Sequence, residues 1–201
     1  MEVEEKIQKH IINYYKCLEL HQIKWKQTVC ELKPFIKALK TQIEQFIVVD
    51  RYNIEKTEFE KYEFLKERLH LKIYKGIEEE FSSISKLISN LNVICHDLRT
   101  KTTQLENLTV TLDWTIDSKS FLVRGSALQR PLGEILDWAY RIMTYYKDVM
   151  AAIYDTFQKI SYLDANSVQK FEECFYENHE IENLVEHALQ YLQLCEQVVV
   201  S

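Results

Sequence analysis

The residues best suited to metal chemistry are the histidines, of which the chain has six. His179 and His187, with Glu182 and Glu186 between them, come closest to a set of metal ligands. Zinc sites usually place their ligands at tighter spacing. Two surface histidines on an acidic helix are therefore the preferred interpretation, and the sequence predicts neither a metal nor another cofactor.

Cys95 is the cysteine whose position is most informative. A reactive thiol needs an electropositive, partly exposed setting. Cys95 instead falls on an apolar line of "GIEEEFSSISKLISNLNVICHDL", residues 76–98, where a cysteine usually fills space as a small apolar group. None of the 5 cysteines forms a C-x-x-C pair, and the N-terminal stretch "MEVEEKIQKH" is charged. These features predict reduced thiols in a nuclear or cytoplasmic protein that is not secreted.

The sequence contains no motif typical of an enzyme. Gly76, Gly125 and Gly133 stand alone, so there is no glycine-rich phosphate loop. Serine hydrolase, zinc protease and kinase signatures are also missing. The acidic residues of "EKTEFEKYEFLKE" alternate with lysine, which is typical of a solvated helix face rather than of paired catalytic carboxylates. We therefore predict that the protein is not an enzyme.

Charge and composition limit the classes of partner. The 201 residues carry a net charge of −6 and no run of five basic residues, so direct binding of nucleic acid is not expected. No apolar run approaches the roughly 18 residues of a membrane span. Only 3 glycines and 2 prolines occur, so few residues can interrupt a helix. The sequence predicts long helices and protein partners.

The first predicted helix covers about residues 3–49. Apolar side chains spaced by four and three residues, from Ile7 to Phe46, share one face of this helix. Pro34 interrupts the line, because proline removes a hydrogen bond and clashes with the preceding turn. Either the helix is kinked there or a second helix begins at Pro34. The kink is favoured, because the spacing continues across the proline.

A second long helix is predicted over about residues 57–108. Thr57 and Glu60 fit a capping box at its start. The apolar spacing of its first half is less regular. Its second half carries a clear line of side chains for burial against other helices: Ile77, Phe81, Ile84, Ile88, Leu91, Cys95, Leu98 and Leu105.

A third long helix, over about residues 131–163, and C-terminal helices over about 166–198 complete the prediction. The fold class is therefore all-α, with three long helices and a shorter C-terminal pair in a single helical unit over residues 1–201. Either an elongated bundle or an antiparallel coiled coil fits this pattern. Whether the helices pair within one chain or between chains stays open.

The connector over residues 109–130 breaks the helical pattern. Val110, Leu112, Trp114 and Ile116 alternate with polar residues, which favours a short strand or an extended loop. Large apolar groups in a connector either fold back onto the helices or bind a partner. Those concerned here are Trp114, Phe121, Leu122 and Val123.

Short matches in three places give the chain a family resemblance. Tyr15–Glu19 and Val29–Lys33 correspond to a W-E-x-L-N and an I-x-N-L-K motif, and Leu105–Leu108 to L-E-N-Y. Tyr146–Asp148, the turn at Asp164 and the pair Phe175 and Tyr176 run parallel to the C-terminal motifs. The chain thus resembles a divergent member of the cyclin-dependent kinase 2-interacting protein family.

The resemblance implies a non-catalytic adaptor linked to DNA replication, cell-cycle kinase and DNA-damage checkpoint complexes, and to an AAA-type ATPase assembly. Its partners would be a cyclin-dependent kinase, replication or checkpoint factors, or the ATPase, in the nucleus. The alternative is a structural coiled-coil subunit of a kinetochore, microtubule-nucleation or vesicle-tethering complex. The predicted partner interface consists of Trp114, Phe121, Leu122, Val123, Phe175 and Tyr176.

Overall fold

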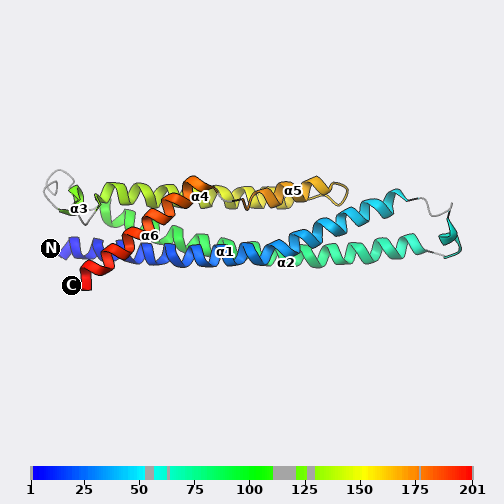
Figure 1. Ribbon diagram of the computed structural model, residues 1–201, viewed down its shortest axis with the longest axis horizontal. Coiled ribbons are helices and arrows are strands. Elements are labelled where there is room, and N and C mark those ends of the chain that lie inside the picture. Colours follow the sequence, from blue (N-terminus) through cyan, green and yellow to red (C-terminus); the bar gives the residue numbers. More distant parts are fainter. Residues whose placement is uncertain are drawn as a thin grey trace. The chain divides into compact units, whose positions relative to one another are not determined.

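The computed structural model describes residues 2–52, 57–62, 64–110, 121–125, 130–176 and 178–200. The regular elements of these residues are helical, apart from one isolated β-bridge between Ser161 and Asp164 (Figure 1). The predicted all-α fold, with three long helices and a shorter C-terminal pair, is confirmed. The elements are α1 (Glu2–Arg51), η2 (Glu58–Lys61, a 3-10 turn), α2 (Leu65–Val110), α3 (Phe121–Arg124), α4 (Leu132–Gln158), α5 (Ala165–Glu173) and α6 (His179–Val200).

The second long helix begins later than the sequence indicated. Thr57 does act as a cap, since its Oγ1 accepts a hydrogen bond from the Phe59 amide at 3.3 Å. It caps only the short turn η2, however, and α2 starts at Leu65. The reason is Phe64, whose φ of 59° lies in the left-handed region that interrupts a helix. The third helix likewise ends at Gln158, before the predicted residue 163.

Helix α1 is continuous through Pro34 and ends at Arg51. A kink at the proline stays a prediction. The end of α1 is held by a side chain of α2: Lys66 Nζ donates to the carbonyl oxygens of Asp50, at 2.7 Å, and Tyr52, at 3.3 Å. A cation at this position satisfies terminal carbonyls and interacts favourably with the helix dipole.

The chain divides into two compact units. Unit 1 contains Met1–Trp25, Asn92–Asp148 and Glu177–Ser201, and unit 2 contains Lys26–Leu91 and Val149–Tyr176. Helices α1, α2 and α4 each contribute residues to both units. The single helical unit over residues 1–201 stays a prediction.

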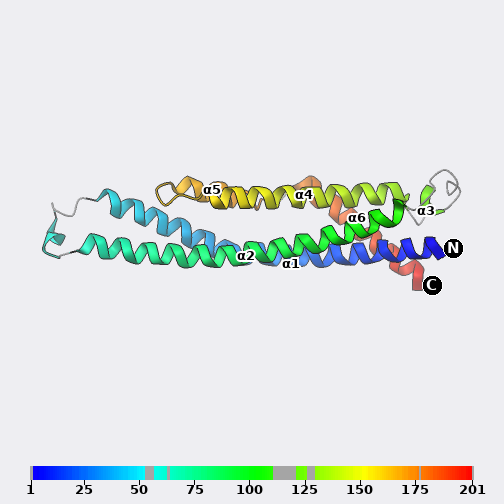
Figure 2. The same cartoon turned by 180° about the vertical axis from the view of Figure 1, so that it is seen from behind.

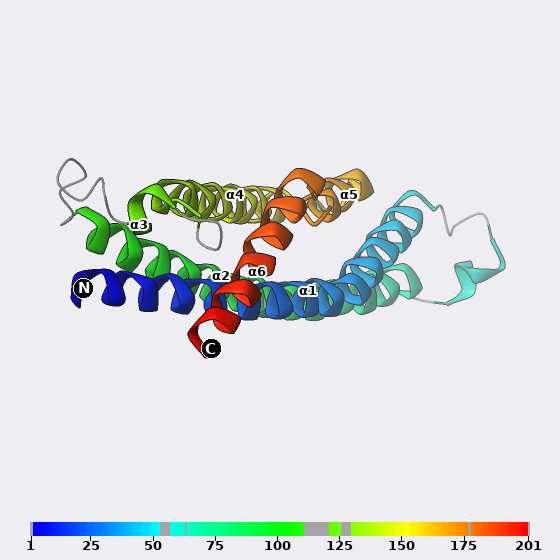
Figure 3. The ribbon, with the colours of Figure 1, turned by 60° about the vertical axis from the view of Figure 1, so that its left-hand side comes forward.

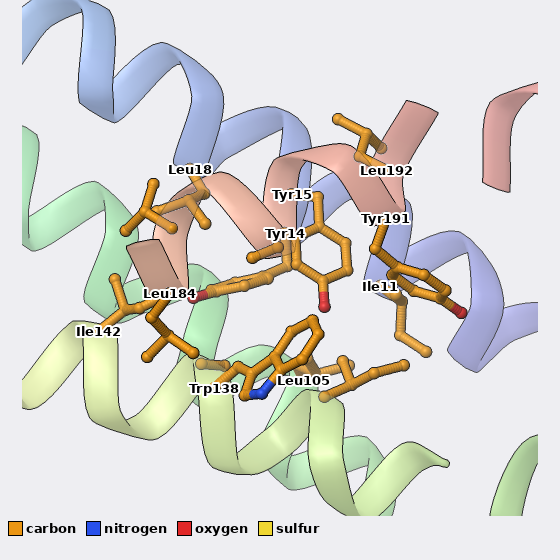
Figure 4. Close-up of a cluster of buried hydrophobic side chains, with 14 of the residues drawn as sticks. Ile11, Tyr14, Tyr15, Leu18, Leu105, Trp138, Ile142, Leu184, Tyr191 and Leu192 are labelled. Carbon is orange, nitrogen blue, oxygen red and sulfur yellow. The ribbon is translucent and has the colours of Figure 1, made fainter. Parts of the chain in front are cut away.

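Unit 1 has a core built mainly by α1, α2, α4 and α6 (Figure 4), to which α3 adds Leu122. Helix α6 runs from α4 to the first half of α1 (Figure 3), and the rings of Tyr15 and Tyr191 meet there at 5.8 Å. The largest buried side chains are apolar or aromatic, as the four-and-three spacing requires. They include Ile7, Ile11, Tyr14, Tyr15, Leu18, Leu98, Leu105, Leu132, Ile135, Trp138, Ile142, Leu184 and Leu192.

In unit 2 the second half of α1 and the first half of α2 lie side by side and run in opposite directions (Figures 1 and 2). The end of α4 and α5 cover part of this pair. The ring of Phe157 connects them, since it lies 5.4 Å from the rings of both Phe81 and Phe171. The buried side chains include Leu32, Ile36, Leu39, Ile43, Ile77, Ile84, Ile88, Leu91, Ile153 and Val168.

Two leucines of α1 provide a matched test of this core. Leu18 is 0% exposed and Leu20 is 50% exposed. We expect Leu18→Ala to lower the free energy of unfolding by about 2–5 kcal/mol, through lost burial and a cavity. Leu20→Ala should change it by less than about 0.5 kcal/mol. Urea denaturation followed by circular dichroism measures both, and equal effects of the two substitutions would contradict the packing of α1.

A single cooperative unit can be tested with the tryptophans. Trp25, Trp114 and Trp138 all fall in the sequence ranges of unit 1, whereas circular dichroism reports on the helices of both units. Because α1, α2 and α4 run through both units, we expect the fluorescence and circular dichroism transitions to coincide. Two separate midpoints would show that the units unfold independently.

Candidate functional site

The predicted interface residues of the connector are placed only in part. Trp114 lies outside the described residues, and Phe121 begins α3 but its side chain is not described. Leu122 is 5% exposed and belongs to the core of unit 1, and Val123 is half-buried. The connector side chains were expected either to fold back onto the helices or to bind a partner, and Leu122 folds back onto the helices of unit 1.

The C-terminal part of the predicted interface lies in unit 2, just after α5. Phe175 is half-buried, with its ring 5.2 Å from that of Phe171. Tyr176 is 67% exposed. Tyr176 is thus free to meet a partner, and the interface as a whole stays a prediction.

The four residues that came closest to a metal site are exposed or half-buried on α6. His179 Nδ1 lies 3.3 Å from Glu182 Oε2, and the His179 side chain is almost fully exposed. Glu186 and His187 are exposed about two turns beyond His179. In the part of the chain that the structure describes, no group of three or more histidine, cysteine or acidic residues could hold a metal ion.

The structure brings together a polar cluster that the sequence did not reveal. In unit 1, Cys95 Sγ of α2 lies 3.9 Å from His21 Nε2 of α1. The His21 ring also lies 4.3 Å from the ring of Tyr146 and is stacked 5.9 Å from that of Trp25. Gln22 Nε2 donates to the Tyr146 hydroxyl at 2.6 Å. The only sequence signal was that His21, Trp25 and Cys95 all occupy apolar lines.

Burial determines the protonation of this cluster. It lowers the pKa of His21, which is 2% exposed, to about 4 and raises the pKa of Cys95 to about 12. Burial also raises the pKa of Tyr146. At neutral pH the imidazole and the thiol are therefore both uncharged. A cysteine nucleophile reacts as the thiolate, so burial of Cys95 disfavours the reactive form of its thiol.

The buried His21 predicts a dependence of stability on pH. Its pKa is about 4 in the folded protein, whereas an ordinary histidine has 6.5, so the unfolded chain binds a proton more readily between these values. The free energy of unfolding should fall as the pH drops from about 6.5 to 4, by at most ~3 kcal/mol from this group. Urea denaturation between pH 7.5 and 4 measures it.

Two histidine substitutions provide the test and the control for the pH experiment. His21→Phe keeps an aromatic ring against Trp25 and Tyr146 and should reduce the loss of stability in this pH range. His96→Gln changes an exposed histidine of α2 and should leave the loss as it is in the wild type. If His21→Phe has no effect on the slope between pH 6.5 and 4, the charge on His21 does not cause it.

Among the described residues, half of the exposed large apolar side chains lie near the turn between α1 and α2, in unit 2. We define the hairpin arm as the described residues 44–52, 57–62 and 64–76, none of whose described side chains is buried. In Figures 1 and 2 this end of the α1–α2 pair extends beyond α5, which also belongs to unit 2. Its exposed apolar side chains are Val48, Tyr52, Phe59, Tyr62, Phe64, Leu69, Leu71 and Tyr74.

An exposed apolar surface of this kind usually marks an interaction site. Sequence reasoning missed it because the spacing in the first half of α2 is irregular. The signal available was the density of aromatic residues between positions 52 and 74, which no line of four-and-three spacing accounts for.

These features define a helical-bundle protein with an uncovered apolar arm. The chain belongs to the family described as "Ribosome biogenesis protein C1orf109-like", whose model matches residues 5–193. A comparison with curated proteins gave no match. In the part of the chain that the structure describes, no helix is both long and apolar enough to span a membrane.

The family match corrects the interpretation of the sequence. The assignment to the cyclin-dependent kinase 2-interacting protein family is wrong. The role in DNA replication, cell-cycle kinase and checkpoint complexes, which was inferred from that resemblance, is therefore also contradicted. The alternative, a kinetochore, microtubule or tethering subunit, gains no support either. Several residues that carried the resemblance are buried core residues, whose apolar types recur in any helical chain. They include Tyr15, Leu18, Leu32, Leu105 and Tyr146.

Proposed function

We propose that this protein acts in ribosome biogenesis as a non-catalytic component that binds other proteins. The observation that carries the proposal is the family match over residues 5–193, which covers nearly the whole chain. Ribosomal subunits are assembled in the nucleus, including the nucleolus, and completed in the cytoplasm. We expect the protein in these compartments.

Two features of the structure support a binding role without catalysis. The one close cysteine–histidine pair found among the described residues, Cys95 and His21, is uncharged at neutral pH. The hairpin arm, in contrast, exposes eight large apolar side chains to solvent. Uncovered apolar surface lowers the free energy of a complex when a partner buries it.

The role in ribosome biogenesis predicts a defect in subunit production. Depletion of the protein in the cells that express it should lower the amount of at least one mature ribosomal subunit and cause a precursor of ribosomal RNA to accumulate. Sucrose-gradient profiles and RNA blots measure these changes, and re-expression of the wild-type chain should restore them. Unchanged profiles after full depletion would contradict the proposal.

The non-catalytic part has a test of its own in the same cells. Cys95→Ala removes the thiol beside His21 while it keeps a small apolar group on the α2 line. We expect this variant to restore ribosomal subunits as well as the wild type does. A folded, normally expressed Cys95→Ala protein that fails to restore them would argue for chemistry at the thiol.

A further inference from the structure

One face of α2 in the hairpin arm combines apolar and basic side chains. Arg68, Leu71, Lys72 and Lys75 follow the spacing i, i+3, i+4 and i+7, which places them on one helix face, and all four are exposed. Phe64 comes just before α2 and lies next to the start of this face, since its carbonyl oxygen accepts a hydrogen bond from the Arg68 amide at 3.0 Å. We call these five residues the α2 stripe. Its two apolar members, Phe64 and Leu71, are 60% and 70% exposed.

The charge of this segment is opposite to that of the whole chain. Residues 65–76 contain Lys66, Arg68, Lys72 and Lys75 but only one acidic residue, Glu67, whereas the chain carries −6. Lys66 is occupied by the carbonyls at the end of α1. Among the described residues no ion pair joins the three cations of the α2 stripe to a carboxylate. The stripe therefore presents three cations around a central leucine.

We propose that the α2 stripe binds an amphipathic helix with acidic residues, supplied by a partner protein. The partner's apolar side chains would cover Phe64 and Leu71, and its carboxylates would meet Arg68, Lys72 and Lys75. A helix fits because its side chains repeat at the same three-and-four spacing as the stripe. This inference rests on the proposed function in one respect only, namely that the protein works by binding other proteins.

RNA is a weaker candidate for this surface. A nucleic acid offers phosphates to cations and bases to aromatic rings, but it has little to cover an aliphatic side chain such as Leu71.

A second copy of the same stripe is also a poor partner. A two-fold symmetric dimer through this face would bring the stripe of one chain against the stripe of the other. Arg68, Lys72 and Lys75 would then face one another, and like charges in contact cost free energy. An acidic partner helix turns the same charges into attraction.

The first experiment identifies what lies against the stripe in the full-length chain. A photo-cross-linking amino acid replaces Leu71, or Phe64 in a second variant, and cell extracts are irradiated. The control carries it at Leu163, which is 65% exposed and also lies in unit 2. We expect adducts at positions 64 and 71 to a protein segment with net negative charge and apolar residues at three-and-four spacing, as read by mass spectrometry.

Several results would overturn the proposal. These are cross-links to RNA, to another copy of the chain or to a basic segment, and adducts no stronger at positions 64 and 71 than at 163. Each can occur while ribosomal subunit production still depends on the protein. Failure of this proposal is therefore distinguishable from failure of the proposed function.

The second experiment tests charge complementarity directly. A synthetic peptide of the cross-linked segment is titrated into the purified chain and followed by fluorescence anisotropy. We expect Leu71→Asp and the double variant Arg68→Glu and Lys72→Glu each to weaken binding at least tenfold, with Leu163→Asp unchanged. A peptide whose carboxylates are replaced by lysine should regain affinity for the double variant. Equal affinity of all variants would exclude the stripe as the binding surface.

Discussion

Unit 1 depends on the burial of two neighbouring residues of α1, Tyr14 and Tyr15, whose rings lie 5.4 Å apart. Successive residues of a helix point about 100° apart, so both can be buried only if other helices cover α1 on two sides. Helix α6 provides one cover through Tyr191. Helices α2 and α4 contribute Leu105 and Trp138 to the same cluster (Figure 4).

Burial between helices also explains why the cysteine–histidine pair of unit 1 carries no charge. His21 and Cys95 lie on the inward lines of α1 and α2, where water is excluded and ionised groups are costly. Burial keeps the imidazole and the thiol neutral at pH 7 and makes them part of the packing. Because the pKa of His21 is lowered, this arrangement destabilises the folded protein below about pH 6.5.

In unit 2, part of the α1–α2 pair has no buried side chains among its described residues. Between residues 77 and 91 of α2, Ile77, Ile84, Ile88 and Leu91 are buried and Phe81 packs against Phe157 of α4, but no described side chain of the hairpin arm is buried. Apolar side chains that would be core residues under a third helix are exposed there instead. An exposed apolar surface of this kind is typical of interaction sites.

The sequence by itself determined the all-α class, the three long helices and the burial of most of the line from Ile77 to Leu105, in which Phe81 and Cys95 are half-buried. These follow from local spacing and from the near absence of glycine and proline. Only the tertiary structure decided which apolar helix faces are buried. The spacing shows which side chains share a face, but it does not show whether another helix packs on that face. It also brought His21 to Cys95 across 74 residues and exposed Leu71. The mistaken resemblance has the same physical origin: buried positions of many helical proteins select the same few apolar residues.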